Sequence, residues 1–322
     1  MKGKPFEVYD LVVVVGLIAF LFNFFSFLLL HKRPTMMGEI ACVFHKALAL
    51  IDMLTGVSNM AFAVRFVAAD FTFLLMIFTM STLSFTLSSV MLLTLICVDR
   101  YIAIKSPLRH LVFFSTTKAK MCVVLVVTLS CAFAVPQTYF THAGGKKVRL
   151  TTMEETTETE ASVKQVVFIV TAIVVIATVG SQTAINILLL KTLVHYFRGQ
   201  QKMPSIRRSV SNQMLQTSLR GARTVLVMTA AFYIVSVPTT VSIGLRYFGI
   251  EVPISAVHAG FVVTQCNSLI NPVIYIAMNT TFRNEALSYF GLKRFVSTST
   301  DHDKKRRKES STPMAVICQH QS

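Results

Sequence analysis

An acid and a base stand side by side near the end of a long apolar stretch of the sequence. They are Asp99 and Arg100, and Tyr101 follows them. An arginine at membrane depth is costly unless it is paired, so we expect Asp99 to hold Arg100 in one state and release it in another. A charge that merely reaches the water at the membrane surface is the alternative interpretation. The tyrosine and a Pro-Leu loop beyond it favour the switch.

A second motif lies in the last apolar stretch, where Pro272 follows Asn271 and Tyr275 lies about one turn later. Because proline lacks a backbone N–H, Pro272 leaves a carbonyl without its helical partner and allows the helix to kink. A helix that bends at one point can act as a switch, and a purely structural kink is the alternative. Asn271 and Tyr275 are therefore predicted to belong to a conformational switch.

Asp52 is an acid in the middle of an apolar stretch, where it is costly unless hydrated or paired. It is therefore a functional candidate by default. We expect no enzyme activity, because the sequence has no His and Cys cluster at metal-ligand spacing, no phosphate-binding glycine loop and no nucleophile elbow. An ion site in a channel or carrier is an alternative for Asp52. The absence of an inverted repeat counts against it.

The elements that must position these residues are long apolar runs. The 322 residues are 53% hydrophobic and 14% charged, whereas about a quarter of an ordinary soluble domain is charged. The runs cover 11–30, 47–64, 71–98, 121–141, 165–190, 224–245 and 252–282. Each approaches or exceeds the roughly 20 residues that cross a hydrocarbon core as a helix. The sequence predicts an all-α integral membrane bundle of seven transmembrane helices, plus a short amphipathic helix on the cytoplasmic face.

Charge predicts the orientation of the bundle. The loops after the first, third and fifth runs, together with the tail, hold 23 of the 31 Lys and Arg residues, so the N-terminus is expected to be extracellular. Residues 1–10 then form a short extracellular N-terminus, 11–278 the seven-helix domain, 279–295 the amphipathic helix and 296–322 a disordered cytoplasmic tail. An outer loop is expected over 140–164. The net charge of +16 suits anionic membrane lipid or an acidic partner, not nucleic acid.

The two motifs lie at the inner ends of their runs and in this order, and they resemble those of the rhodopsin-like (class A) G-protein-coupled receptors. They are Asp99-Arg100-Tyr101, followed by Pro107-Leu108-Arg109, and Asn271-Pro272-Val273-Ile274-Tyr275, with Phe282 beyond it. The resemblance covers nearly the whole chain and implies a plasma-membrane receptor that passes a ligand signal to a heterotrimeric G protein. It implies that Arg100 faces the G protein once the sixth helix swings outward about Pro238, with Phe232 as a packing wedge. A receptor kinase and an arrestin are further implied partners.

The resemblance also implies an allosteric sodium ion and a ligand pocket. The sodium ligands would be Asp52, Ser89, Asn267, Ser268 and Asn271, and a hydrated polar network without an ion is the alternative. The pocket would be lined by Thr82, Thr86, Thr239, Thr240, Phe261 and Gln265. Because this set is uncharged and Thr82 replaces the acid of amine receptors, the expected ligand is a non-amine small molecule, a lipid or a peptide. No other cofactor is expected.

The sequence departs from the family pattern at several positions. Ser236 stands where the family has a tryptophan before Pro238, and Leu75 stands where it has a disulfide cysteine. The base of the sixth run carries no acid, so no ion pair can join it to Arg100. These losses predict elevated basal activity. The lost cysteine and the lack of a span-five proline resemble the lysophospholipid, cannabinoid and melanocortin branch. A receptor subunit that does not signal by itself is a further alternative.

Overall fold

The regular elements of the protein are helices throughout the part of the chain that the structure describes. A computed structural model describes residues 8–33, 38–64, 72–106, 110, 115–142, 158–201 and 212–289. The helices are α1 (Val8–Lys32), α2 (Glu39–Val64), α3 (Thr72–Lys105), α5 (Thr116–His142), α6 (Glu158–Gln201), α7 (Asn212–Tyr247), α8 (Ile254–Gln265), α9 (Asn267–Met278) and α10 (Thr280–Tyr289). The predicted all-α fold is confirmed.

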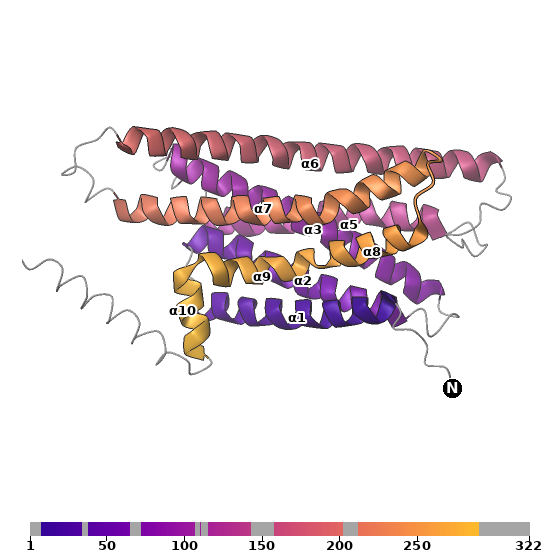
Figure 1. Cartoon of the computed structure of the whole chain (residues 1–322), viewed down its shortest axis with the longest axis horizontal. Coiled ribbons are helices and arrows are strands. Elements are labelled where there is room, and N and C mark those ends of the chain that lie inside the picture. The colour runs from indigo at the N-terminus through magenta and orange to yellow at the C-terminus, as the bar shows by residue number, and fades with distance from the viewer. Residues whose placement is uncertain are drawn as a thin grey trace, which may run out of the picture.

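Seven segments in the described ranges are long and apolar enough to cross a membrane, which confirms the predicted number of spans. They lie in α1, α2, α3, α5, α6 and α7, and the seventh combines α8 with α9. The spanning helices run along one axis of the molecule (Figure 1). The helix α10 turns across one end of the bundle, and α1 begins at the other (Figure 1). We call these the α10 end and the opposite end.

The described ranges differ from the expected boundaries at two places. α1 begins at Val8, so its first turn includes residues expected in the extracellular N-terminus. α5 continues to His142 and α6 begins at Glu158, so the expected loop over 140–164 is partly helical at both ends. The tail at 296–322 and the Pro107-Leu108-Arg109 loop lie outside the described residues.

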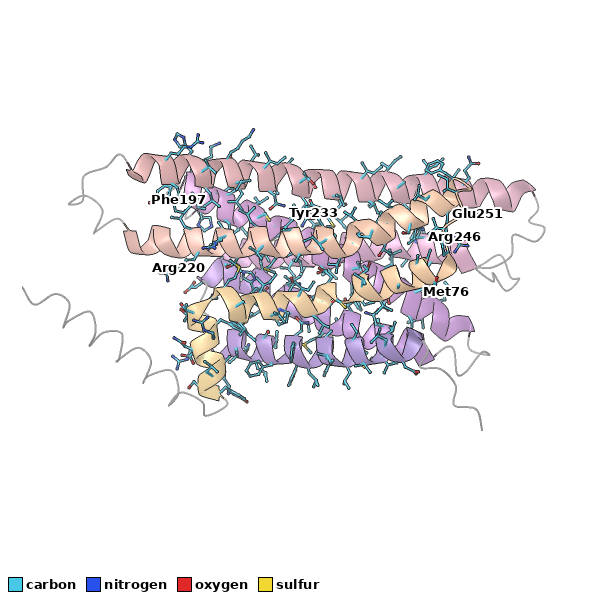
Figure 2. All side chains as sticks on the ribbon, in the orientation of Figure 1. Met76, Phe197, Arg220, Tyr233, Arg246 and Glu251 are labelled. Carbon is cyan, nitrogen blue, oxygen red and sulfur yellow. The ribbon has the colours of Figure 1, made fainter. Side chains whose placement is uncertain are left out.

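The outward faces of the helices carry large apolar side chains, as a bundle in lipid requires. Met121 on α5, Ile176 on α6 and Ile234 on α7 are 66%, 70% and 75% exposed. Many of the side chains drawn on α6 and α1 project from the outer faces of the bundle (Figure 2). These surfaces therefore suit the hydrocarbon interior of a membrane.

The seventh span is interrupted between α8 and α9. Its helical pattern breaks at Cys266, whose N–H bonds to the Val263 carbonyl three residues back, 3.0 Å away. The sequence predicted a kink at Pro272, which lies inside α9, six residues later. Because Pro272 has no N–H, it leaves the Ser268 carbonyl without a helical donor. Asn23 of α1 supplies that donor, with its Nδ2 atom 2.7 Å from the Ser268 oxygen.

The α10 helix is held against the ends of α1 and α9. Its Phe282 side chain is completely buried and lies 5.7 Å from the Tyr275 ring, centroid to centroid. Tyr289 packs edge-on against Phe25 of α1 at 5.6 Å, and the Lys32 ammonium lies 4.7 Å from the same tyrosine ring. The described α10 lies inside the expected amphipathic segment 279–295, of which 290–295 are not described.

Two glycines allow α1 and α2 to touch through their backbones. A Cβ atom at Gly56 would lie 2.7 Å from the Gly16 carbonyl oxygen and 3.2 Å from the Phe20 nitrogen. A Cβ atom at Gly16 would lie 2.8 Å from the Gly56 oxygen. Because the atoms that a Cβ at Gly56 would meet most closely belong to the backbone of α1, no side-chain rotation can make room for it. These positions fix the distance between the first two helices.

We therefore expect Gly56→Ala to destabilise the protein by about 1–3 kcal/mol, because α1 and α2 must move apart. The measurement is thermal unfolding of the detergent-solubilised protein. Gly180→Ala is the matched control, since a Cβ atom there meets nothing within 4 Å. It should leave the unfolding temperature unchanged or raise it slightly, because alanine favours helix. Equal unfolding temperatures for Gly56→Ala and the unmodified protein would contradict the contact.

Candidate functional site

A buried ion pair lies near the α10 end of α3. The Arg100 Nη2 atom is 3.0 Å from Asp99 Oδ2, and the two side chains are 9% and 1% exposed. The other carboxylate oxygen, Oδ1, lies 2.8 Å from Nε2 of His110, just beyond the helix. Two charges can be buried at this depth because each offsets the desolvation of the other. The adjacent acid thus holds Arg100, as the sequence predicted, and a histidine shares that acid.

The arginine side chain lies directly against the backbone of α7. A Cβ atom placed on Gly221 would be 3.2 Å from both Cδ and Nη1 of Arg100. The glycine leaves the space that the guanidinium group occupies between α3 and α7. Because no acid stands on α7 here, the two helices meet at this level through packing rather than through an ion pair. Any movement of this end of α7 changes the surroundings of Arg100.

Tyr101 points to a different neighbourhood from Arg100. Its hydroxyl accepts a hydrogen bond from the Lys105 ammonium, 2.6 Å away on the same helix. Its ring packs against a small apolar cluster contributed by α3, α6 and α7. The buried members are Ile104, Leu189, Leu193, Leu219 and Ala222. Tyr101 therefore helps to join three helices at the α10 end.

The tyrosine of the second motif is buried and bonded to α2. The Tyr275 hydroxyl lies 2.9 Å from Nδ1 of His45, and the two rings meet edge to face with centroids 5.1 Å apart. Tyr275 is 1% exposed and His45 5%. A polar pair enclosed by apolar side chains is stabilising only while both partners keep their bond. Rotation of Tyr275 would therefore require His45 to lose this partner.

One helical turn deeper, the Asp52 carboxylate joins α2 to α3 and α9. Ser89 Oγ donates to Oδ1 at 3.1 Å, and Asn271 Nδ2 donates to Oδ2 at 2.7 Å. Asp52 is completely buried. Asn267 and Ser268 are also buried, in the first turn of α9, but among the described residues neither side chain hydrogen-bonds to Asp52. Three of the five residues predicted as sodium ligands thus meet directly.

Toward the opposite end, α7 and α8 are joined by threonines. Thr239 Oγ1 donates to the Gly260 carbonyl at 2.7 Å and accepts from Thr264 Oγ1 at 2.8 Å. Gln265, predicted to line a ligand pocket, accepts a hydrogen bond from the Asn59 amide of α2. Thr240 is exposed and bonds to the Ser236 carbonyl of its own helix, 2.9 Å away.

The other residues predicted to line the pocket are placed less completely. Thr82 and Thr86 are half-buried on α3, one turn apart. The side chain of Phe261 lies outside the described residues. The predicted set is therefore spread over three helices, and two of its members, Thr239 and Gln265, already bridge to neighbouring helices.

The pivot and wedge expected in the sixth span both lie in α7. Pro238 lies inside the helix, and Phe232 is 6% exposed. The Phe232 ring meets the Tyr233 ring at 5.7 Å, and the Tyr233 hydroxyl lies 2.7 Å from Thr183 Oγ1 of α6. Tyr233 lies midway along α7, between its two ends (Figure 2). These contacts secure the middle of α7 to α6.

The comparison with protein families decides what kind of protein carries this geometry. The family described as "7 transmembrane receptor (rhodopsin family)" matches residues 11–275. The chain belongs to this family of receptors. The receptor is accordingly a multi-pass membrane protein and not an enzyme.

Two curated relatives resemble the receptor over a short part of their length. The 5-hydroxytryptamine receptors 2C of Homo sapiens and Mus musculus are 33% identical to it over 98 residues. The match covers 29% of the receptor and 21% of each relative. The alignment thus spans about a fifth of the length of these curated relatives.

Sequence reasoning missed three residues of the receptor that touch the predicted switches. His45 and His110 were passed over, although each is a titratable side chain near one end of an apolar run. Gly221 gave a weaker signal, as a lone glycine between the basic residues Arg220 and Arg223. The contacts of His45 with Tyr275 and of Gly221 with Arg100 join segments far apart in the sequence, so no local spacing reveals them. His110 lies 11 residues from Asp99, beyond the end of α3, where no helical spacing relates the two.

The contact between His45 and Tyr275 is testable by a double-mutant cycle. His45→Phe and Tyr275→Phe each remove one partner of the bond but keep a ring of similar shape. We expect each substitution to lower the stability of the receptor. The double variant should lose about 1 kcal/mol less stability than the two single variants lose together, because the one hydrogen bond is lost in each of them. Thermal unfolding in detergent gives the comparison. Strictly additive losses would show that the two side chains do not interact.

Proposed function

We propose that the receptor activates a heterotrimeric G protein at the α10 end of its bundle. The observation that carries this proposal is the buried Asp99 and Arg100 pair, whose arginine packs against α7 at Gly221. An outward movement of this half of α7, pivoting at Pro238, would lift Gly221 away from Arg100 and admit an acidic or carbonyl-bearing partner. A freed guanidinium with five N–H donors suits the end of a partner helix.

The proposed orientation puts the α10 end in the cytoplasm of a cell and the start of α1 outside its plasma membrane. It is supported by the distribution of basic residues, 23 of 31 of which belong in sequence to the loops after the first, third and fifth spans and to the tail. Basic residues at this end also suit the anionic lipids of the inner leaflet. A receptor kinase and an arrestin are further proposed partners, acting on Ser297 to Thr300 in the tail, which lies outside the described residues.

The proposed ligand is a non-amine small molecule, a lipid or a peptide that enters from the opposite end. The matched relatives are named for 5-hydroxytryptamine, which is an amine. We favour a different class because Thr82 stands at the position that supplies a carboxylate in amine receptors. Its hydroxyl is buried without a hydrogen-bond partner in the described structure, so it can bond to a ligand. Ser236 likewise has a buried hydroxyl without a partner among the described residues.

We also propose an allosteric sodium site around Asp52. Hard cations take oxygen ligands, and Asp52 and Ser89 offer a carboxylate and a hydroxyl 3.1 Å apart. Asn271 could turn its amide oxygen toward the ion, and Asn267 and Ser268 could complete the set. An ion held between α2, α3 and α9 would favour the packed arrangement of these helices. The packed state would then bind sodium more tightly than the signalling state, so sodium would oppose signalling.

The proposed coupling predicts that Arg100→Ala abolishes G-protein activation. We expect nucleotide exchange to fall to the level of membranes without the receptor, since no other side chain at this position can supply the guanidinium. The assay is GTP-analogue binding by a co-reconstituted G protein, with surface expression measured in parallel. Arg246→Ala is the matched control, because Arg246 lies at the other end of α7 (Figure 2). Unchanged exchange by Arg100→Ala would overturn the proposed coupling.

The proposed sodium site predicts a salt-specific effect on basal exchange. Replacing choline chloride by sodium chloride at constant ionic strength should lower the basal exchange of the unmodified receptor. Asp52→Asn should remove this difference, because the carboxylate is the charged ligand. Glu285→Gln is the control, since Glu285 lies on α10 and pairs with Arg33 at 3.8 Å. A sodium effect of the same size in Asp52→Asn would place the ion elsewhere.

A further inference from the structure

The helix α6 carries a buried polar side chain on its inward face. This helix lies along one edge of the bundle (Figure 1), and among its described side chains only Gln182, Leu189 and Leu193 are buried. Gln182 is 0% exposed, so its amide is enclosed as completely as the side chain of Leu189. A polar group in such a place is costly unless it is hydrogen-bonded. Gln182 belongs to none of the sites proposed above.

The amide of Gln182 has no hydrogen-bond partner in the part of the chain that the structure describes. Both its oxygen and its nitrogen are buried and unbonded, whereas the buried amides of Asn23 and Asn59 lack a partner for the oxygen alone. An unbonded buried polar atom destabilises the arrangement that buries it, because water bonds to the same atom when it is exposed. Two such atoms in one side chain therefore oppose the observed packing.

The contacts on either side of Gln182 lead to the two helices that the proposed activation separates. Three residues before it on α6, the Val179 carbonyl accepts a hydrogen bond from the Tyr233 hydroxyl of α7 at 3.4 Å. One turn after it, Asn186 Oδ1 accepts from Cys97 Sγ of α3 at 3.3 Å. Along α6, Gln182 thus lies between a contact with α7 and a contact with α3.

Asn186 shows how a second amide is accommodated on the same helix. Its Nδ2 atom donates to the main-chain carbonyl of Gln182 at 2.8 Å, while its Oδ1 atom accepts from Cys97. Both atoms of the Asn186 amide are therefore bonded. The two residues carry the same chemical group one helical turn apart, and they differ in whether the packed arrangement satisfies that group.

We propose that Gln182 destabilises the packed arrangement of α3, α6 and α7 and thereby raises basal activity. The inference rests on the proposed function, in which the half of α7 nearest α10 moves outward about Pro238. That half includes Tyr233, so the movement breaks the contact beside Gln182 and opens its surroundings to water, which bonds to the amide. The amide is satisfied in the signalling arrangement and unsatisfied in the packed one. The elevated basal activity expected from lost family residues thus gains a second cause, in a residue that is present.

Thermal unfolding of the detergent-solubilised receptor tests the unbonded amide without any G protein. Gln182→Met removes the amide and keeps an unbranched side chain of similar length. It should raise the unfolding temperature by about 2–4 °C, because the packed arrangement no longer buries two unbonded polar atoms. Asn186→Leu is the matched control, since it removes an amide whose two atoms are bonded. This control should lower the unfolding temperature.

The control separates the loss of an unbonded amide from a general benefit of apolar residues within a membrane. A rise of equal size in both variants would overturn the proposal, because Gln182 would then behave like its bonded neighbour. An unchanged or lower unfolding temperature for Gln182→Met would also overturn it, because the amide of Gln182 would then be bonded in the packed receptor. A Gln182→Met receptor that does not fold counts as a lower temperature.

Basal nucleotide exchange by a co-reconstituted G protein tests the link to signalling. Gln182→Met should lower basal exchange by at least about fivefold, the factor that a modest gain in the stability of the packed arrangement produces. Asn186→Leu should not lower it. A higher unfolding temperature without lower exchange would overturn the link to signalling and leave the unbonded amide established. If the unmodified receptor shows no exchange above receptor-free membranes, the proposed function fails, and the unfolding temperatures still decide whether Gln182 destabilises the packed arrangement.

Discussion

The burial of one guanidinium group governs the arrangement of the α10 end. Arg100 is 7% exposed, in a place where an unpaired charge would be costly, so its pairing with Asp99 is a condition of the observed packing. The two charges compensate each other within α3. The helix α7 has to leave space for the guanidinium group, and Gly221 provides that space. Removing Asp99 would take from the buried guanidinium the carboxylate that compensates its charge. Moving α7 would instead uncover the pair. The interaction that stabilises the packed arrangement is thus the one that a partner protein can exploit.

Two further polar contacts join α2 to the seventh span. Asp52 bonds to Asn271, and His45 bonds to Tyr275, so α2 holds α9 at two levels about one turn apart. Between them, Pro272 deprives the Ser268 carbonyl of its helical donor, and Asn23 of α1 takes that role. A helix with a missing internal bond and three external ones can change shape by exchanging partners without leaving polar groups bare in lipid. This explains how the seventh span can be both well anchored and able to bend.

The sequence was sufficient for features that depend on local pattern. Long uncharged runs predicted the seven spans, because hydrocarbon thickness fixes the length of a crossing helix. The pairing of Asp99 with Arg100 followed from adjacency, and the environment of Asp52 from the scarcity of polar partners in lipid. The contacts of His45, His110 and Gly221 were not predictable, because they depend on how each helix is rotated about its axis. The break at Cys266 was not predicted, for a related reason. Pro272 shows which helical hydrogen bond is missing, but the position at which the helix deforms depends on the packing of its neighbours.

The central claim is that α7 and α3 separate at the α10 end when a G protein binds. The distance between spin labels at Lys105 of α3 and Ser218 of α7, introduced as cysteines in a background free of other reactive thiols, tests it most directly. Pulsed electron paramagnetic resonance should find a single distance in the receptor alone and a distance longer by several ångström with nucleotide-free G protein bound. An unchanged distance in a complex shown to be intact would contradict the account, because Arg100 would then remain covered by Gly221 while the receptor signals.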